Sequence, residues 1–207
     1  MASQHALRLA GIVFGAVIAV IALLALVWYG IYTPLRERQR QQTLQERGPA
    51  LLHNKKVDLD RYAGRWHEIA RKPNPFERGC VDAAATYTLV DEKIEVRNEC
   101  VRANGAKTSA LGRAVSLNDK NTALRVSFAP RWLGSGAAGD YWILHVDDAY
   151  QNALVGSPDR QYLWLLSRSP TVANDTLANF ARMASVKGFD VGDFARGAQH
   201  EQAARKE

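Results

Sequence analysis

Short runs of β-forming residues recur along most of the chain, and their spacing limits the possible fold more than any other feature of the sequence. Turn residues separate the clearest runs, which are RWHEIAR, ATYTLV, IEVRN, TALRVSF, YWILHV, NALVG and YLWLLS. Several short strands at this spacing are typical of a sandwich or a barrel. The fold class predicted from these runs is therefore all-β.

The runs also alternate between apolar and polar residues. In IEVRNEC and in TALRVSF every second residue falls on a covered face, because successive side chains of a strand point to opposite sides. Alternation alone assigns six residues of these two runs to the interior: Ile94, Val96, Asn98, Leu124, Val126 and Phe128.

One helix is predicted near the end of the chain. Its apolar residues follow the i, i+3, i+4, i+7 spacing of a helix face, as Leu177, Phe180, Ala181 and Ala184 do. Asn174 or Asp175 is expected to cap its start, and Gly188 to end it.

A sheet accompanied by a single helix keeps two open edges unless it closes on itself. A closed barrel of eight strands leaves an interior that can hold one small ligand. A packed sandwich without a cavity fits the same pattern, so the strand runs alone leave both architectures open.

An uncharged apolar run, residues 9–32, precedes the β-rich part of the chain. As a helix it matches the roughly 30 Å thickness of a hydrocarbon core, and Trp28, Tyr29 and Tyr32 would lie at the interface. A cleavable signal peptide is the competing interpretation, but the run exceeds a signal core of about 7–15 residues and lacks a clear small-x-small site. The sequence therefore predicts one N-terminal transmembrane helix.

The chain divides into an N-terminal flank (1–8), the transmembrane helix (9–32), a polar linker (33–56), the β-rich domain (57–198) and a tail (199–207). Its formal net charge of +6 is spread along the chain rather than gathered in one block, which argues against nucleic acid as a partner. A lipid bilayer is the expected partner of the apolar run.

The sequence contains no motif for catalysis or metal binding. The histidines form no H-E-x-x-H pair, and two cysteines cannot by themselves build a thiolate zinc site. A G-x-S-x-G elbow, a P-loop and a G-x-G-x-x-G fingerprint are also missing. We therefore expect a binding protein, not an enzyme, with no metal or cofactor; His145 or Cys100 acting inside a cavity is the catalytic alternative.

A series of motifs resembles the lipocalins, specifically their bacterial and apolipoprotein-D-like branch. The series opens with a Gly-x-Trp motif, Gly64-Arg65-Trp66, inside YAGRWHEIAR. The later motifs follow in family order and at family spacing across nearly the whole domain, as PFERG, ATY, DDAY, ALV, YLWLLSRSP and GFD.

The resemblance implies an eight-stranded antiparallel up-and-down β-barrel with one C-terminal α-helix. It also implies that Gly64 and Trp66 lie at the closed end, with Arg168 packed against the indole ring through a cation–π contact. Aromatic side chains are expected to line the ligand cavity, namely Trp132, Tyr141 and Trp164.

Two polar residues are expected inside the barrel. Glu68 is in phase with Trp66, and a buried carboxylate needs a partner or a polar ligand head. Asn98 could contact a ligand head in the same way. Both could instead belong to a polar network near the barrel floor.

The only cysteines of the chain, Cys80 and Cys100, flank a predicted hairpin. Related lipocalins often carry cysteines at these places, which favours a disulfide over two free thiols. A disulfide indicates an oxidising compartment. Arginines after the apolar run, Arg36, Arg38, Arg40 and Arg47, argue for the opposite membrane orientation.

The resemblance implies that the protein binds and carries a small hydrophobic ligand, a fatty acid or a lysophospholipid. Together with the apolar run, it predicts a single-pass protein of a bacterial inner membrane with its barrel in the periplasm. One alternative is a structural or partner-recruiting envelope protein with a filled barrel. Another is an enzyme that acts on a sequestered apolar substrate.

Overall fold

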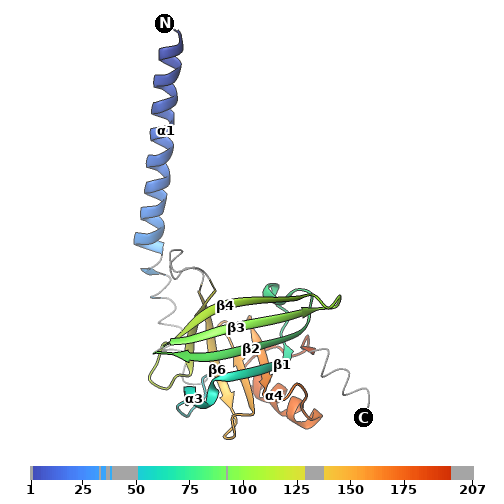
Figure 1. Ribbon diagram of the computed structural model, residues 1–207. Coiled ribbons are helices and arrows are strands. Elements are labelled where there is room, and N and C mark those ends of the chain that lie inside the picture. The colour runs from blue at the N-terminus through green and yellow to red at the C-terminus, as the bar shows by residue number, and fades with distance from the viewer. Residues whose placement is uncertain are drawn as a thin grey trace. The chain divides into compact units, whose positions relative to one another are not determined.

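The computed structural model describes residues 2–32, 34–35, 38, 51–91, 93–128 and 138–196. The chain divides into two compact units, residues 1–46 and 47–207. In the first unit, the helix α1 (Ala2–Val27) continues as a π-helical turn over Trp28–Tyr32 (Figure 1). The apolar run predicted to be helical is therefore helical.

A membrane crossing by this helix is not confirmed. Within the described part of the chain, no helix combines the length and the apolar character that a crossing requires. The regular α-helix ends at Val27, so the aromatic end of the run leaves the α-helical repeat.

The second unit is an antiparallel barrel of eight strands, as predicted (Figure 1). Each strand pairs with the next, and β1 pairs with both β2 and β8, which closes the sheet. The strands are β1 (Gly64–Arg71), β2 (Cys80–Val90), β3 (Lys93–Arg102), β4 (Lys107–Ser116), β5 (Ala123–Ser127), β6 (Ala138–Val146), β7 (Asn152–Gly156) and β8 (Leu163–Ser167). A short β9 (Ala195–Arg196) adds to the edge of β1.

Three helical segments with described bounds accompany the barrel. The α-helix α3 (Leu59–Tyr62) precedes β1, and the 3-10 turn η2 (Pro75–Glu77) lies between β1 and β2. The predicted C-terminal helix is α4 (Asn174–Val186), which buries Leu177, Phe180 and Ala184. The expected side-chain cap is wrong, because Ala173 occupies the N-cap position without a side-chain hydrogen bond.

Two β-bulges change which side chains face the lumen. A bulge in β1 between Glu68 and Ala70 places Arg71 opposite Trp164, and Glu68 lies opposite Leu166. Leu166 belongs to the buried cluster inside the barrel. Since residues directly opposite each other share a face, and Trp164 and Leu166 are two residues apart on β8, both Glu68 and Arg71 point inward.

The bulge in β6, between Ile143 and His145, turns His145 outward. His145 lies opposite Leu154, which alternates with the interior residues Ala153 and Val155. Its ring contacts Phe180 of α4, with 5.8 Å between centroids. The catalytic alternative that placed His145 inside the cavity is therefore wrong.

The predicted disulfide is confirmed. Cys80 at the start of β2 and Cys100 near the end of β3 are bonded, with 5.5 Å between their Cα atoms. The bond also removes Cys100 as a free thiol. It ties the two strands together at the end of the barrel where the β1–β2 and β3–β4 loops lie.

Candidate functional site

The closed end of the barrel is built around Trp66 and Arg168. The Arg168 guanidinium lies 3.9 Å from the centroid of the Trp66 ring, so the contact that the resemblance implied is present. The same guanidinium donates hydrogen bonds of 2.8–3.1 Å to the carbonyl oxygens of residues 61, 62, 63 and 65. Arg168 thereby holds the end of α3 and the start of β1 beneath the indole ring.

Gly64 is required at this junction for two reasons. Its φ of +97° is a conformation that residues with a side chain rarely adopt. A Cβ at this position would also lie 3.2 Å from Nη1 of Arg168. The glycine therefore permits both the chain direction into β1 and the close approach of the guanidinium.

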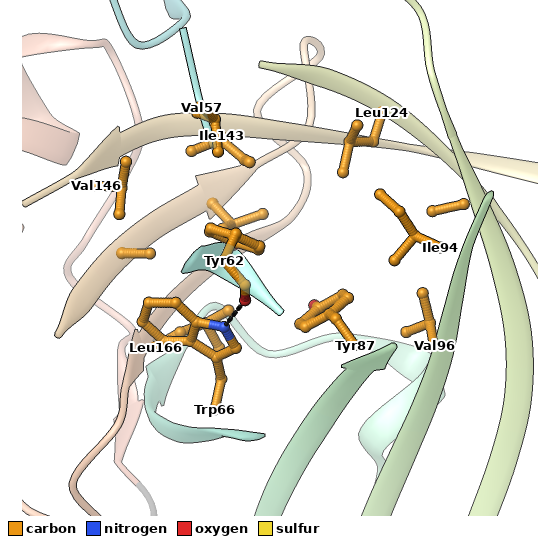
Figure 2. Close-up of a cluster of buried hydrophobic side chains, with 13 residues drawn as sticks. Val57, Tyr62, Trp66, Tyr87, Ile94, Val96, Leu124, Ile143, Val146 and Leu166 are labelled. Carbon is orange, nitrogen blue, oxygen red and sulfur yellow. Dashed lines mark hydrogen bonds between the residues drawn. The ribbon is translucent and has the colours of Figure 1, made fainter. Parts of the chain in front are cut away.

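A layer of three tyrosines lies above the floor. The hydroxyl groups of Tyr62 and Tyr141 are 2.7 Å apart, and Tyr87 donates to Tyr141 over 2.9 Å. Burial raises the pKa of all three phenols, so they stay protonated at neutral pH. Figure 2 shows Tyr62, Trp66 and Tyr87 among the buried apolar side chains that fill this half of the barrel.

In the other half of the barrel several inward-facing side chains are more exposed, although Ala83, Glu68 and Arg71 stay buried there. Near the floor, the inward-facing side chains of Tyr87, Val96 and Leu124 are 4%, 2% and 0% exposed. One step further toward the β1–β2 and β3–β4 loops, the inward-facing residues of the same strands are only half-buried, namely Ala85, Asn98 and Val126. Solvent therefore reaches these side chains from this end, and we call this half of the lumen the cup and the tyrosine layer its filled base.

Phe128 stands at the rim of the cup. Its side chain is 43% exposed. Its ring packs against Gly112, where an added Cβ would lie only 2.7 Å from the ring. Gly112 is paired with the inward-facing Val96. The ring therefore lies over the inner face of β4, as the alternation predicted.

A charged cluster lines the cup beside Trp164. Arg71 donates a buried hydrogen bond to Glu68, and it also donates to the carbonyl oxygen of Cys80 over 2.8 Å. Glu77 of η2 lies 3.4 Å from Nε of Arg71 and accepts a hydrogen bond from the Trp164 indole over 3.2 Å. Two carboxylates therefore share one guanidinium at the lumen wall.

The cluster changes the protonation of Glu68. Burial is the largest cause, and the neighbouring Glu77 carboxylate adds to it, so the pKa of Glu68 rises to about 8 although Arg71 opposes the shift. At neutral pH Glu68 therefore holds its proton most of the time.

The structure brings together some of the predicted site residues and separates others. Glu68 and Trp164 share the charged cluster, Asn98 and Phe128 lie across the lumen on β3 and at the end of β5, and Tyr141 belongs to the tyrosine layer below. Trp132 lies outside the described residues. Sequence reasoning missed four residues of the lumen: Tyr62, Arg71, Glu77 and Tyr87.

Two polar hollows lie at the closed end, away from the cup. One of about 230 Å³ is lined by His53, Arg61 and Tyr150 among others, and another of about 660 Å³ by the β4–β5 loop. Among the described residues, no three histidine, cysteine or acidic side chains gather as metal ligands.

Comparisons with known proteins agree with this architecture. Residues 57–199 match the family model of the lipocalin-like domain. Temperature-induced lipocalin-1 of Arabidopsis thaliana is 39% identical over 143 residues, which cover 66% of this chain and 76% of that protein. The outer membrane lipoprotein Blc of Escherichia coli is 36% identical over 151 residues, or 72% of this chain and 81% of that protein.

A mammalian relative and a solved structure extend the match. Apolipoprotein D of Mus musculus is 32% identical over 145 residues, which cover 65% of this chain and 72% of that protein. Lobster apocrustacyanin A1 superposes with a TM-score of 0.55 at 17% identity, over 77% of this chain and 85% of that one, which shows the fold alone. The chain belongs to the lipocalin-like family, with bacterial lipoproteins and apolipoprotein D among its relatives.

Proposed function

We propose that the protein binds a fatty acid or a lysophospholipid in the open half of its barrel and carries it within the cell envelope. The observation that carries this proposal is the graded exposure of the inward-facing side chains, from buried at the tyrosine layer to 43% exposed at Phe128. The lipocalin-like fold and the relatives support the binding of a small hydrophobic ligand.

The walls of the cup favour an acyl chain. Each Å² of apolar surface removed from water contributes about 25 cal/mol, and Ala85, Val126, Phe128 and Trp164 offer apolar contact along the lumen. The tyrosine layer limits how deep the chain can reach. The methylene groups contribute affinity rather than selectivity.

The polar head of the ligand would lie in the upper cup. Glu68 and Glu77 face the lumen with Arg71, and Asn98 lies on the inner face of β3. These groups can donate or accept hydrogen bonds at the level where an acyl chain would end. We infer that they orient the head group, and that Trp164 packs against the first methylene groups.

A variant whose lumen is filled by a larger side chain tests the proposal. Ala85 lies on the inner face of β2, and Thr88 on the outer face of the same strand. In a titration of the delipidated full chain with 11-(dansylamino)undecanoic acid, Ala85→Trp should weaken binding at least about tenfold, because the indole occupies the ligand volume. Thr88→Trp is the matched control and should bind as the wild type does.

One observation favours the structural alternative, a barrel that is packed shut. Tyr62, Tyr87 and Tyr141 meet across the lumen and fill its lower half. If the wild-type chain fails to bind the dansyl fatty acid at micromolar concentrations, the filled base is the functional state, and the barrel instead supports a partner at its surface.

We also propose that α1 attaches the protein to a membrane. Its described side chains are large, apolar and highly exposed, including Phe14 at 69%, Ile21 at 61% and Leu26 at 70%. Exposed apolar surface on this scale is typical of contact with lipid or protein. The full chain should stay with membranes after alkaline carbonate washing, and Ile21→Lys with Leu24→Lys should release it.

We place the barrel in the periplasm. The Cys80–Cys100 disulfide supports an oxidising compartment, although the arginines that follow α1 favour the opposite orientation. Protease added to spheroplasts should digest the barrel. A barrel that resists digestion until the cells are lysed would place it in the cytoplasm.

A further inference from the structure

The loop between β1 and β2 exposes the side chain of Phe76 to solvent. Its side chain is 75% exposed, and it lies in the 3-10 turn η2 between β1 and β2. Oδ1 of Asn74 accepts hydrogen bonds from the backbone N–H groups of Phe76 and Glu77, and Pro75 fixes the first position of the turn. The turn is therefore capped by hydrogen bonds where it presents an exposed aromatic ring.

Phe76 begins a line of aromatic rings that leads into the barrel. Its ring centroid is 5.4 Å from that of Tyr162, and Tyr162 stacks on Trp164 with 5.9 Å between centroids and 17° between planes. Trp164 lies on the inner face of β8, beside the charged cluster of the cup. The three rings thus connect the outer tip of the rim with the lumen wall.

Cations gather in two of the loops around Phe76, while the β7–β8 loop that reaches it carries Asp159 beside Arg160. The β1–β2 and β3–β4 loops are described throughout, and their cations and those next to them are Lys72, Arg78, Arg102 and Lys107. The one carboxylate in these two loops, Glu77, is turned toward Arg71 and Trp164. An exposed phenylalanine flanked by cations complements a surface that is apolar inside and anionic outside.

We propose that Phe76 and the cations beside it form a docking surface for an anionic lipid bilayer. Phe76 inserts among the acyl chains, while Arg78 and Arg102 contact the headgroups. The ligand then passes between the bilayer and the cup along Tyr162 and Trp164. The ligand path rests on the proposed carrier function, but the docking itself does not.

Hydrogen exchange of the full chain tests the docking. The test needs no ligand, and it does not depend on whether α1 is in the membrane. Vesicles of phosphatidylcholine with phosphatidylglycerol should slow exchange in residues 72–79, and vesicles of phosphatidylcholine alone should do so much less. The β4–β5 loop at the opposite end of the barrel, residues 117–122, should not change. For Phe76→Ser, the vesicle concentration that half-protects residues 72–79 should rise about tenfold.

A matched control separates docking from a general loss of apolar surface. Val90 is 43% exposed at the opposite end of the barrel, and Val90→Ser should keep the wild-type protection. Arg78→Gln should reduce the difference between anionic and neutral vesicles. The proposal would be overturned if anionic vesicles did not slow exchange in residues 72–79. It would also be overturned if Phe76→Ser left this protection at the wild-type level.

The carrier function is tested separately, by measuring the affinity of the chain for the dansyl fatty acid in water. Phe76→Ser should leave that affinity unchanged, because Phe76 lies outside the cup. Protection of residues 72–79 without any fatty acid binding would support the docking and contradict the proposed function. Fatty acid binding without protection of residues 72–79 would support the proposed function and contradict the docking.

Discussion

Glu68 makes the stability of the barrel depend on pH. Its pKa is raised to about 8 from 4.5 by burial and by Glu77, so between these values the folded protein holds a proton that the unfolded chain has released. The free energy of unfolding is therefore highest below about pH 4.5 with respect to this group, and it falls as the pH rises toward 8. The direction follows from the burial of Glu68 and from the nearby Glu77 carboxylate, which together outweigh Arg71.

Glu68→Gln should remove most of this dependence. Urea denaturation at about pH 5 and about pH 8 measures the free energy of unfolding, and the wild type should lose more of it between the two than the variant does. Equal losses in the two proteins would mean that Glu68 is ionised in the folded state at neutral pH.

Arg168 should not be replaceable by lysine. A lysine keeps the charge over Trp66 but cannot serve several carbonyl oxygens at once, since it lacks the planar fork of the guanidinium. Arg168→Lys is expected to lower the free energy of unfolding by about 2 kcal/mol. Arg182→Lys on the exposed face of α4 should change it by less than about 0.5 kcal/mol, and similar effects in the two variants would contradict the account of the floor.

At the scale of single elements, the bulges explain why part of the site escaped prediction. Alternation counted from Trp66 places Glu68 inward, which the register bears out, but it places Arg71 outward. The bulge after Glu68 reverses the phase, and ordinary residues surround it, so no local signal marks it. Strand β4 was not predicted for another reason. Its sequence, KTSALGRAVS, buries only Gly112 and Ala114 and therefore lacks an apolar alternation.

The hairpin of β2 and β3 should depend on its disulfide. The bond joins residues 20 apart in the sequence, and closing such a loop in the unfolded chain contributes about 3 kcal/mol to stability. The double variant Cys80→Ser, Cys100→Ser should show this loss in urea denaturation, and wild type with reductant should match it. A loss below about 1 kcal/mol would mean that strand pairing alone holds the hairpin.

At the scale of the whole molecule, the closed barrel was predictable and its filled base was not. Regular short runs and the Gly-x-Trp series indicate the barrel, because each is a local feature of the sequence. Alternation gives the direction of a side chain but not how far it reaches across the lumen. Tyr62, Tyr87 and Tyr141 come from α3, β2 and β6, and only the assembled fold brings their hydroxyl groups together.

The graded exposure of the lumen is the central claim, and native mass spectrometry of the full chain with palmitic acid tests it most directly. One bound fatty acid is expected per wild-type chain and per Thr88→Trp chain, and far less on Ala85→Trp, whose indole occupies the ligand volume. A wild-type chain that takes up no fatty acid, or an Ala85→Trp chain that takes up as much as the wild type, would contradict it.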